Sequence, residues 1–261
     1  MSTFANDLFS KFNERWNEVY LLLRMIEHSS DDSEIDAICR ATTVLIIANF
    51  EGFLVDTIKV FIDDVNRFGS FKHTPYEMKR THCSQFINVE DGGNGYRLNK
   101  LIESLSGLNA KYDSEQFLHE KGKNPKPTVI EEYFRKISGN NFFSYIADCD
   151  LEKVFENDNE FYNTQFSKLY TCLINGTKTF PYSVDISELS FNQENKKVRE
   201  CIWMTFLGET LKKRHSVAHG ETFDNVSSLP ELRSIVDKIK LLELCFAIMC
   251  CHSLAVSATS E

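Results

Sequence analysis

The stretch at residues 31–58 reads DDSEIDAICRATTVLIIANFEGFLVDTI, and it decides the fold class. Its first residues, Asp31-Asp32-Ser33, form a capping cluster of the kind that accepts hydrogen bonds from the free N–H groups of a helix start. A long helix is therefore predicted from about residue 34 to residue 67. With only 5 prolines and 11 glycines in 261 residues, the chain lacks the turns of an all-β architecture.

Further helical patterns lie on both sides of this segment. Apolar residues recur at three- and four-residue spacing over residues 4–27, 158–174 and 195–214, and Ser228 with Glu231 predicts the cap of a last helix reaching about residue 257. Thr128 with Glu131 predicts another capping box, opening a short helix that ends near Gly139. The positions expected to be buried are Phe4, Leu8, Phe12, Trp16, Tyr20 and Leu23 in the first helix, and Val198, Ile202, Phe206 and Leu211 in the 195–214 helix.

These patterns predict an all-α protein built on an antiparallel four-helix bundle. The bundle is expected to comprise residues 1–67 and 195–261, and residues 68–194 are expected to form a mostly helical insertion of unknown role. After Leu241 the last helix is apolar nearly all round. Such a helix is expected to be buried on both sides, against the bundle and against a partner chain.

Composition limits the functional classes. The net charge of −9 opposes non-specific binding to nucleic acid, so an RNA-binding role would need a local basic patch. The eight cysteines include no CxxC pair, which fits a reducing cytoplasm rather than a disulfide framework or a zinc ribbon. The longest apolar runs are too short to span a bilayer, and no targeting segment is visible. We therefore expect a cytoplasmic protein that does not enter membranes.

The clearest candidate site is KKRHSVAHG at residues 212–220. Arginine stays protonated in proteins whereas histidine titrates near neutrality, so the two together can stabilise a phosphorane charge and move a proton. On a continuous helix Arg214 and His219 would point about 140° apart. Gly220 predicts a helix end at which both side chains converge. The structural alternative is a basic cluster that complements the helix dipole.

The two histidines of this cluster also have the i, i+4 spacing of metal ligands. Neither an HExxH glutamate nor a nearby cysteine completes a ligand set with His215 and His219. The prediction is therefore a site without metal or other cofactor.

A second pair of charges lies in the predicted long helix. Arg40 and Glu51 are eleven residues apart, close to three helical turns, and so share one stripe with Ile47, Leu54 and Ile58. Because that stripe is apolar, both charges are expected to face the interior, where unpaired charges are costly. One reading is a structural ion pair across helices. The other is that Glu51 orients Arg214 or His219.

These two motifs resemble those of a known superfamily. Arg214, a polar residue and then His219 match the Rx4–6H motif of the HEPN superfamily of helical ribonucleases, although His215 stands where Asn or Asp is commoner. The string from Asn49 to Leu54 looks like the Glu-Gly-Phe signature on an early helix of the same domains, and Gly220 suits the RiboL-PSP and MAE-type members.

The resemblance implies a homodimer whose Arg-His motifs face each other across a two-fold axis. It implies metal-independent endonucleolytic cleavage of RNA by the 2′-OH, leaving a 2′,3′-cyclic phosphate. In that scheme His219 moves a proton, Arg214 holds the phosphate, and His215 shares either task. Glu51 orients the cluster with Arg40 in support, and Lys212 and Lys213 add charge for RNA binding.

The resemblance also implies a biological role. Such proteins are often toxins of prokaryotic toxin–antitoxin or phage-defence systems, which can need an antitoxin or an activator protein. Two alternatives stay open from the sequence: a non-catalytic helical module that binds a protein or a nucleotide, and a structural dimerisation domain.

Overall fold

The computed structural model describes residues 2–87, 94–118, 124–192, 198–220 and 227–259, and all regular secondary structure within them is helical. The all-α prediction is thus confirmed. The α-helices are α1 (Phe4–Ser10), α2 (Asn17–His28), α3 (Asp32–Phe68), α4 (Tyr76–Ser84), α5 (Asn94–Leu108), α6 (Pro127–Ser138), α7 (Phe143–Ile146), α8 (Asn159–Gly176), α9 (Ile202–Ala218) and α10 (Leu229–Thr259). Short 3-10 helices are η1 (Glu14–Trp16), η2 (Phe71–His73), η3 (Ser114–Gln116) and η4 (Asp150–Glu156).

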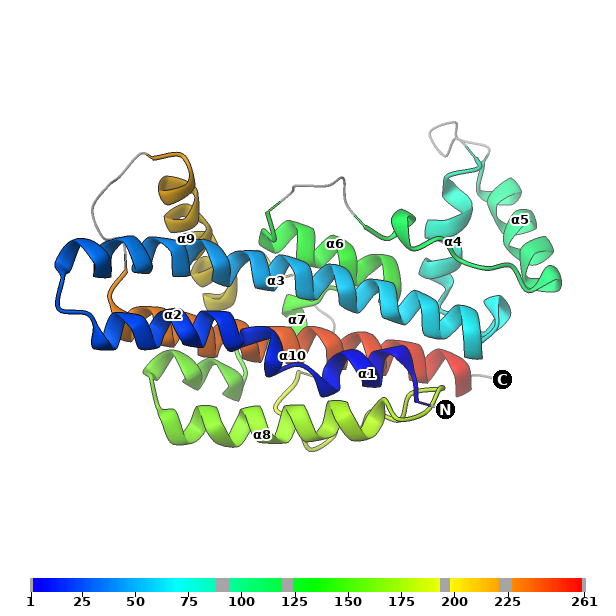
Figure 1. Cartoon of the computed structure of the whole chain (residues 1–261). Helices are drawn as coiled ribbons and strands as arrows, with labels where there is room; N and C mark the ends of the chain where they lie inside the picture. Colours follow the sequence, from blue (N-terminus) through cyan, green and yellow to red (C-terminus); the bar gives the residue numbers. More distant parts are fainter. Residues whose placement is uncertain (1, 88–93, 119–123, 193–197, 221–226, 260–261) are drawn as a thin grey trace.

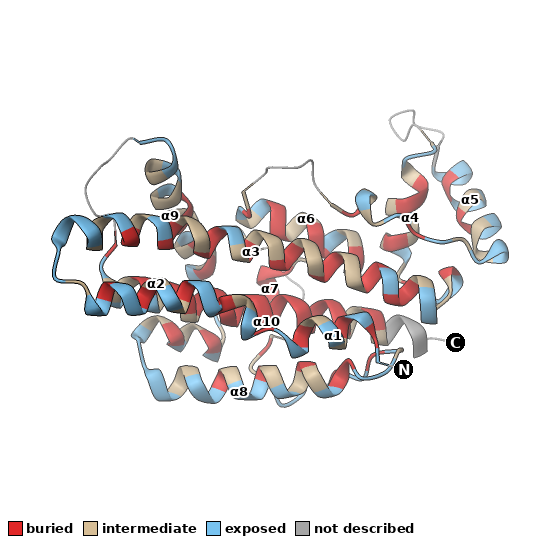
Figure 2. Cartoon of the chain, viewed as in Figure 1, coloured by how far each residue is buried: buried red, intermediate tan, exposed pale blue. Residues whose placement is uncertain are grey.

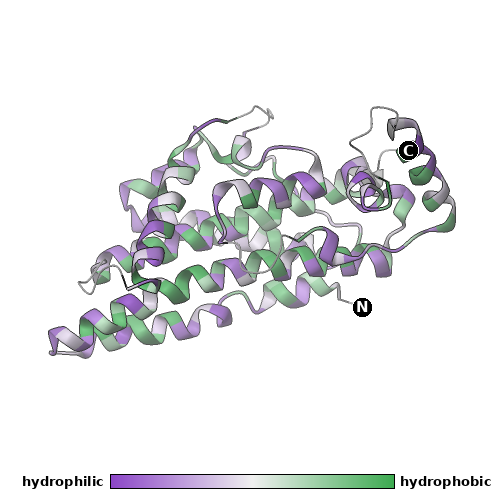
Figure 3. Ribbon diagram, turned by 90° about the horizontal axis from the view of Figure 1, so that it is seen from above, coloured by the Kyte–Doolittle hydropathy of each residue, from purple (hydrophilic) through white to green (hydrophobic). Residues whose placement is uncertain are grey.

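Helix α3 is the longest described helix, and its 37 residues extend about 55 Å. The Asp31 side chain accepts hydrogen bonds from the N–H groups of Ser33 (2.8 Å) and Glu34 (3.3 Å), so the predicted cap is confirmed. Helices α1 and α2 run antiparallel to α3, whereas α8 and α10 run in the same direction as α3 (Figure 1). Hydrophilic and hydrophobic residues alternate around most of the helices (Figure 3), as amphipathic packing requires.

The first predicted helix is broken into α1, η1 and α2. Helix α1 ends at Ser10, where the N–H of Lys11 bonds the carbonyls of Leu8 and Phe9. Phe9 before the break and Trp16 after it are both fully buried. Phe4 was expected in the core and is 40% exposed, packed beside Phe68 instead.

Helix α10 is the centre of the core. Every residue from Leu241 to Cys251 is buried, as predicted (Figure 2). Its second face was expected to meet a partner chain, but α8 and α6 of the same chain pack against it instead. Both helices belong to the predicted insertion and their apolar residues join the same core. The bundle and the insertion therefore share one hydrophobic core. Their division at residues 67 and 195 stays a prediction.

Helix α9 begins later than expected and is rotated from the predicted face. It starts at Ile202, which is 42% exposed, and residues 195–197 of the predicted start lie outside the described residues. Trp203 and Leu207 are fully buried, one residue after the predicted Ile202 and Phe206, whereas the predicted burial of Leu211 is confirmed. The indole of Trp203 packs edge-on against the Phe155 ring (4.8 Å between centroids) and so decides which face turns inward.

The predicted capping box of α6 is also wrong. The helix starts at Pro127, and the Glu131 carboxylate accepts hydrogen bonds from the N–H groups of Phe142 (2.9 Å) and Phe143 (3.0 Å). It thus holds the turn that follows the helix. The predicted end is confirmed, because Gly139 is the C-cap with a left-handed backbone (φ +79°).

Candidate active site at the end of helix α9

The Arg-His cluster lies in the last turn of α9. The helix runs on through Ala218, so Arg214 is inside it and His219 is the C-cap residue, whose N–H bonds the carbonyl of His215 (3.0 Å). Gly220 follows with a left-handed backbone (φ +66°), which glycine adopts without strain. The predicted helix end at Gly220 is therefore confirmed, whereas the predicted end of regular structure at Arg214 is wrong.

This geometry pairs the two histidines. The rings of His215 and His219 lie one turn apart with centroids 4.2 Å from each other, and both residues are exposed. Arg214 is half-buried, and its Nε is buried without a hydrogen-bond partner among the described residues. A continuous helix sends Arg214 and His219 in different directions, about 140° apart.

The lysines of the cluster differ from each other. Lys213 donates a hydrogen bond to Glu231 at the start of α10, so much of its charge is neutralised locally. Lys212 is exposed. Beyond Glu231 a hollow of about 680 Å³ opens between α8 and α10, lined in part by Tyr162, Arg233 and Lys238.

Arg40 and Glu51 lie on α3 as predicted, and both are half-buried rather than turned fully inward. Eleven residues separate them by about 16 Å along the helix, which is too far for a direct pair. Within the described part of the chain, no hydrogen bond or ion pair joins Glu51 to Arg214 or His219. The orienting role of Glu51 stays a prediction.

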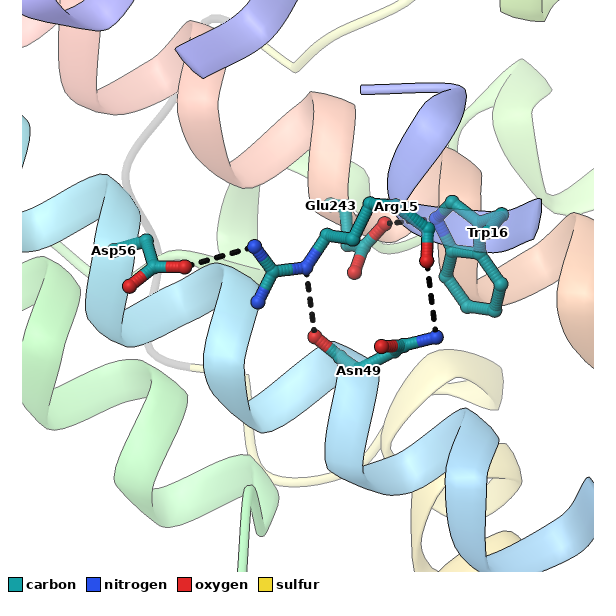
Figure 4. A network of polar contacts seen from close by, with 5 residues as sticks. All are labelled: Arg15, Trp16, Asn49, Asp56 and Glu243. Atoms are coloured by element: carbon teal, nitrogen blue, oxygen red, sulfur yellow. Dashed lines mark hydrogen bonds and ion pairs between the residues drawn. The ribbon is translucent and has the colours of Figure 1, made fainter. Parts of the chain in front are cut away.

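The Glu-Gly-Phe string has a structural role that the sequence did not reveal. Arg15 reaches from η1 across the face of Gly52: its Nη1 bonds Asp56 (2.8 Å) and its Nε bonds the Asn49 carbonyl (3.4 Å; Figure 4). A Cβ on Gly52 would lie 2.5 Å from Arg15 Nη2. Phe53, the next residue, is buried. Two of the three residues of the string are thus explained by packing.

A buried carboxyl group lies beside this arginine. Trp16 Nε1 donates a hydrogen bond to Glu243 Oε2 (3.2 Å; Figure 4), and Glu243 Oε1 has no partner among the described residues. Burial raises the pKa of Glu243 well above its ordinary value, although nearby Arg15, the Trp16 bond and Lys240 act in the opposite direction. Sequence reasoning missed this group, because a glutamate within an apolar helix gave no sign of its partners.

The raised pKa predicts that Glu243→Gln stabilises the protein at neutral pH. In the folded chain the carboxyl group keeps its proton to higher pH than in the unfolded chain, where it ionises with its ordinary pKa of 4.5. Stability of the unmutated protein therefore falls, relative to the variant, as pH rises above that value. Urea unfolding from pH 4 to pH 8 should give a difference in the free energy of unfolding that is near zero at the acid end and grows in favour of the variant as pH rises. A variant that is less stable at every pH would contradict the neutral carboxyl.

No described helix is long and apolar enough to cross a membrane. In the described residues, no group of three His, Cys, Asp or Glu side chains lies close enough to hold a metal ion.

A helical core with an Arg–x4–His motif at a helix end defines a HEPN-type domain. Comparison with known families supports this class, because a sequence model of the RiboL-PSP-HEPN family matches residues 10–252. The chain belongs to this family, as the resemblance predicted. Neither the curated proteins nor the solved structures contain a significant match to it.

Proposed function

We propose that this protein is a metal-independent endoribonuclease. In the proposed reaction the 2′-OH of RNA attacks the adjacent phosphate and the 5′-oxygen leaves, giving a 2′,3′-cyclic phosphate and a 5′-hydroxyl. The observation that supports this proposal most directly is the geometry at the end of α9. Two exposed, adjacent histidines lie there within about one turn of Arg214. Membership of a HEPN family supports the same chemistry.

The side chains have distinct proposed roles. His219 moves a proton as general acid or base, because imidazole titrates near neutrality. Arg214 binds the phosphate and the charge of the transition state, and its buried Nε lacks a partner in the described chain. His215 shares the proton transfer or positions the phosphate. Glu51 and Arg40 hold the cluster in orientation, and Lys212 attracts RNA.

A homodimer with a composite site fits this geometry. Within one chain Arg214 and His219 leave the helix in different directions. A second copy related by a two-fold axis would place its His219 opposite Arg214, and it would double the local positive charge in a protein with a net charge of −9. The proposed active unit is therefore two chains.

The proposed biological role is that of a cytoplasmic toxin in a toxin–antitoxin or phage-defence system, held in check or triggered by another protein. The competing proposal is a non-catalytic helical module for protein or nucleotide binding. Growth of a host that expresses the protein separates the two. We expect expression to stop growth and His219→Ala to restore it.

Sequencing RNA ends after a short induction tests the chemistry itself. We expect new cleavage sites whose 5′ fragments end in a cyclic phosphate, and none in cells that express His219→Ala at the same level. Growth arrest without new RNA ends would favour the non-catalytic module.

A further inference from the structure

The described residues between Asn66 and Tyr112 (66–87 and 94–112) form a lobe at the C-terminal end of α3 (Figure 1). The Asn66 side chain closes it, donating to the Tyr112 carbonyl (2.9 Å) and accepting from the Tyr112 N–H (2.8 Å). Helices α4 and α5 pack against each other within the lobe, which we call the α4–α5 lobe.

The lobe has a charge opposite to that of the whole chain. Residues 66–112 contain seven Lys or Arg and four Asp or Glu, a net charge of +3, so the rest of the chain carries −12. A local basic surface on an acidic protein directs a polyanion to one place, since the remaining surface repels it.

Aromatic rings are exposed on the same lobe. Tyr96 on α5 is 70% exposed, Tyr76 on α4 is 52% exposed, and Phe86 after α4 is 64% exposed. Single exposed rings are common on protein surfaces, whereas exposed rings gathered on one lobe mark a binding surface. The two tyrosines are neighbours here, because the Tyr76 hydroxyl bonds Asn99 (3.1 Å), which lies one turn from Tyr96 on α5.

Cations alternate with these rings. Lys100 Nζ lies 5.3 Å from the centroid of the Tyr96 ring. Arg80 follows Tyr76 by one turn on the exposed side of α4, where its Nη1 also pairs with Glu77 (3.0 Å). Rings interleaved with cations suit a strand whose bases can splay out, because each base can stack while its phosphate meets a positive charge. A duplex offers no free base to stack.

We infer that the α4–α5 lobe binds single-stranded RNA, stacking bases on Tyr96 and Tyr76 and holding phosphates with Lys100 and Arg80. This inference rests on the proposed function in one respect: the bound strand is the substrate cut at α9. In the view of Figure 1 the C-terminal end of α9 and the lobe both lie above α3, toward its opposite ends. One RNA molecule must therefore be long to reach both.

Binding is measured by fluorescence anisotropy on the full-length His219→Ala protein, so that RNA is not cut. The probes are labelled oligouridylates of about 8 and about 24 nucleotides, and an RNA duplex of the longer length, chosen around the site sizes of single-strand grooves. We expect Tyr96→Ala to weaken binding of the longer single strand about five- to tenfold and Tyr96→Phe to retain it. Lys100→Glu should weaken binding and lower its salt dependence.

Lys168→Glu is the matched control, because Lys168 is exposed on α8 and carries the same charge change away from the lobe. Its affinity should equal that of the parent. Equal affinity in Tyr96→Ala and its parent, or tighter binding of the duplex than of the single strand, would overturn the inference. The inference would also be overturned if the lobe bound a protein partner and none of the RNA probes. Because binding is read in an uncut complex, absence of cleavage in the unmutated protein would reject the nuclease and leave this result standing.

Discussion

Replacing His219 with Ala is expected to lower RNA cleavage by about 100- to 10,000-fold, the usual contribution of a general acid or base. Arg214→Ala should lower it by about 100-fold or more, because a charge-stabilising donor is lost. Folding should not change, since His219 is exposed at a helix end. The measurement is single-turnover cleavage of a labelled RNA by purified protein, with circular dichroism to verify the helix content.

His28→Ala provides the control, because His28 is an exposed histidine at the end of another helix, α2. Mixing the two inactive variants tests the composite site. If Arg214 of one chain works with His219 of the other, random heterodimers should recover about a quarter of the activity. Variants that cleave as fast as the unmutated protein would reject the mechanism, and a mixture without recovery would place the site within one chain.

A second effect, on the free energy of unfolding, is expected at Gly52. A Cβ there would lie 2.5 Å from Arg15 Nη2, so Gly52→Ala forces the guanidinium away from Asp56 and Asn49. Because the clashing atom is the end of a flexible side chain, we expect the cost to be that of the partly exposed Arg15–Asp56 pair, about 0.2–1 kcal/mol in the free energy of unfolding. In an Arg15→Ala background the same change should instead stabilise by about 0.5–1 kcal/mol, because alanine favours a helix interior over glycine.

Urea unfolding of the four proteins in this double-mutant cycle measures the reversal of sign. Gly208→Ala is the matched control, since Gly208 is also inside a helix and a Cβ added there would meet nothing within 4 Å among the described residues. It should stabilise in both backgrounds. If Gly52→Ala behaves like Gly208→Ala in the presence of Arg15, the glycine is not needed for packing.

These expectations divide the Glu-Gly-Phe string between two tasks. Family resemblance connects Glu51 with the catalytic cluster, and the structure explains Gly52 and Phe53 by the core and by Arg15. Neighbouring residues of one motif can therefore be required for different reasons, some for folding and some for function. The sequence could not separate the two, because Arg15 lies 37 positions before Gly52 and its approach is a long-range contact.

Predictions from local pattern succeeded where local chemistry decides the result. The cap at Asp31, the left-handed Gly139 and Gly220, and the long helices α3, α8 and α10 all follow from hydrogen bonding or periodicity within a few residues. Glu131 failed as a helix cap because two N–H groups eleven and twelve residues away compete for its carboxylate.

By itself the sequence determined an all-α HEPN-family protein and the residues of its candidate site, because helical period and short motifs are local properties. Only the tertiary structure decided the break after α1, the face that α9 buries and the approach of Arg15 to Gly52. The physical reason is common to these cases. Periodicity fixes which residues share a face, but the largest side chains and their distant partners decide which face turns inward.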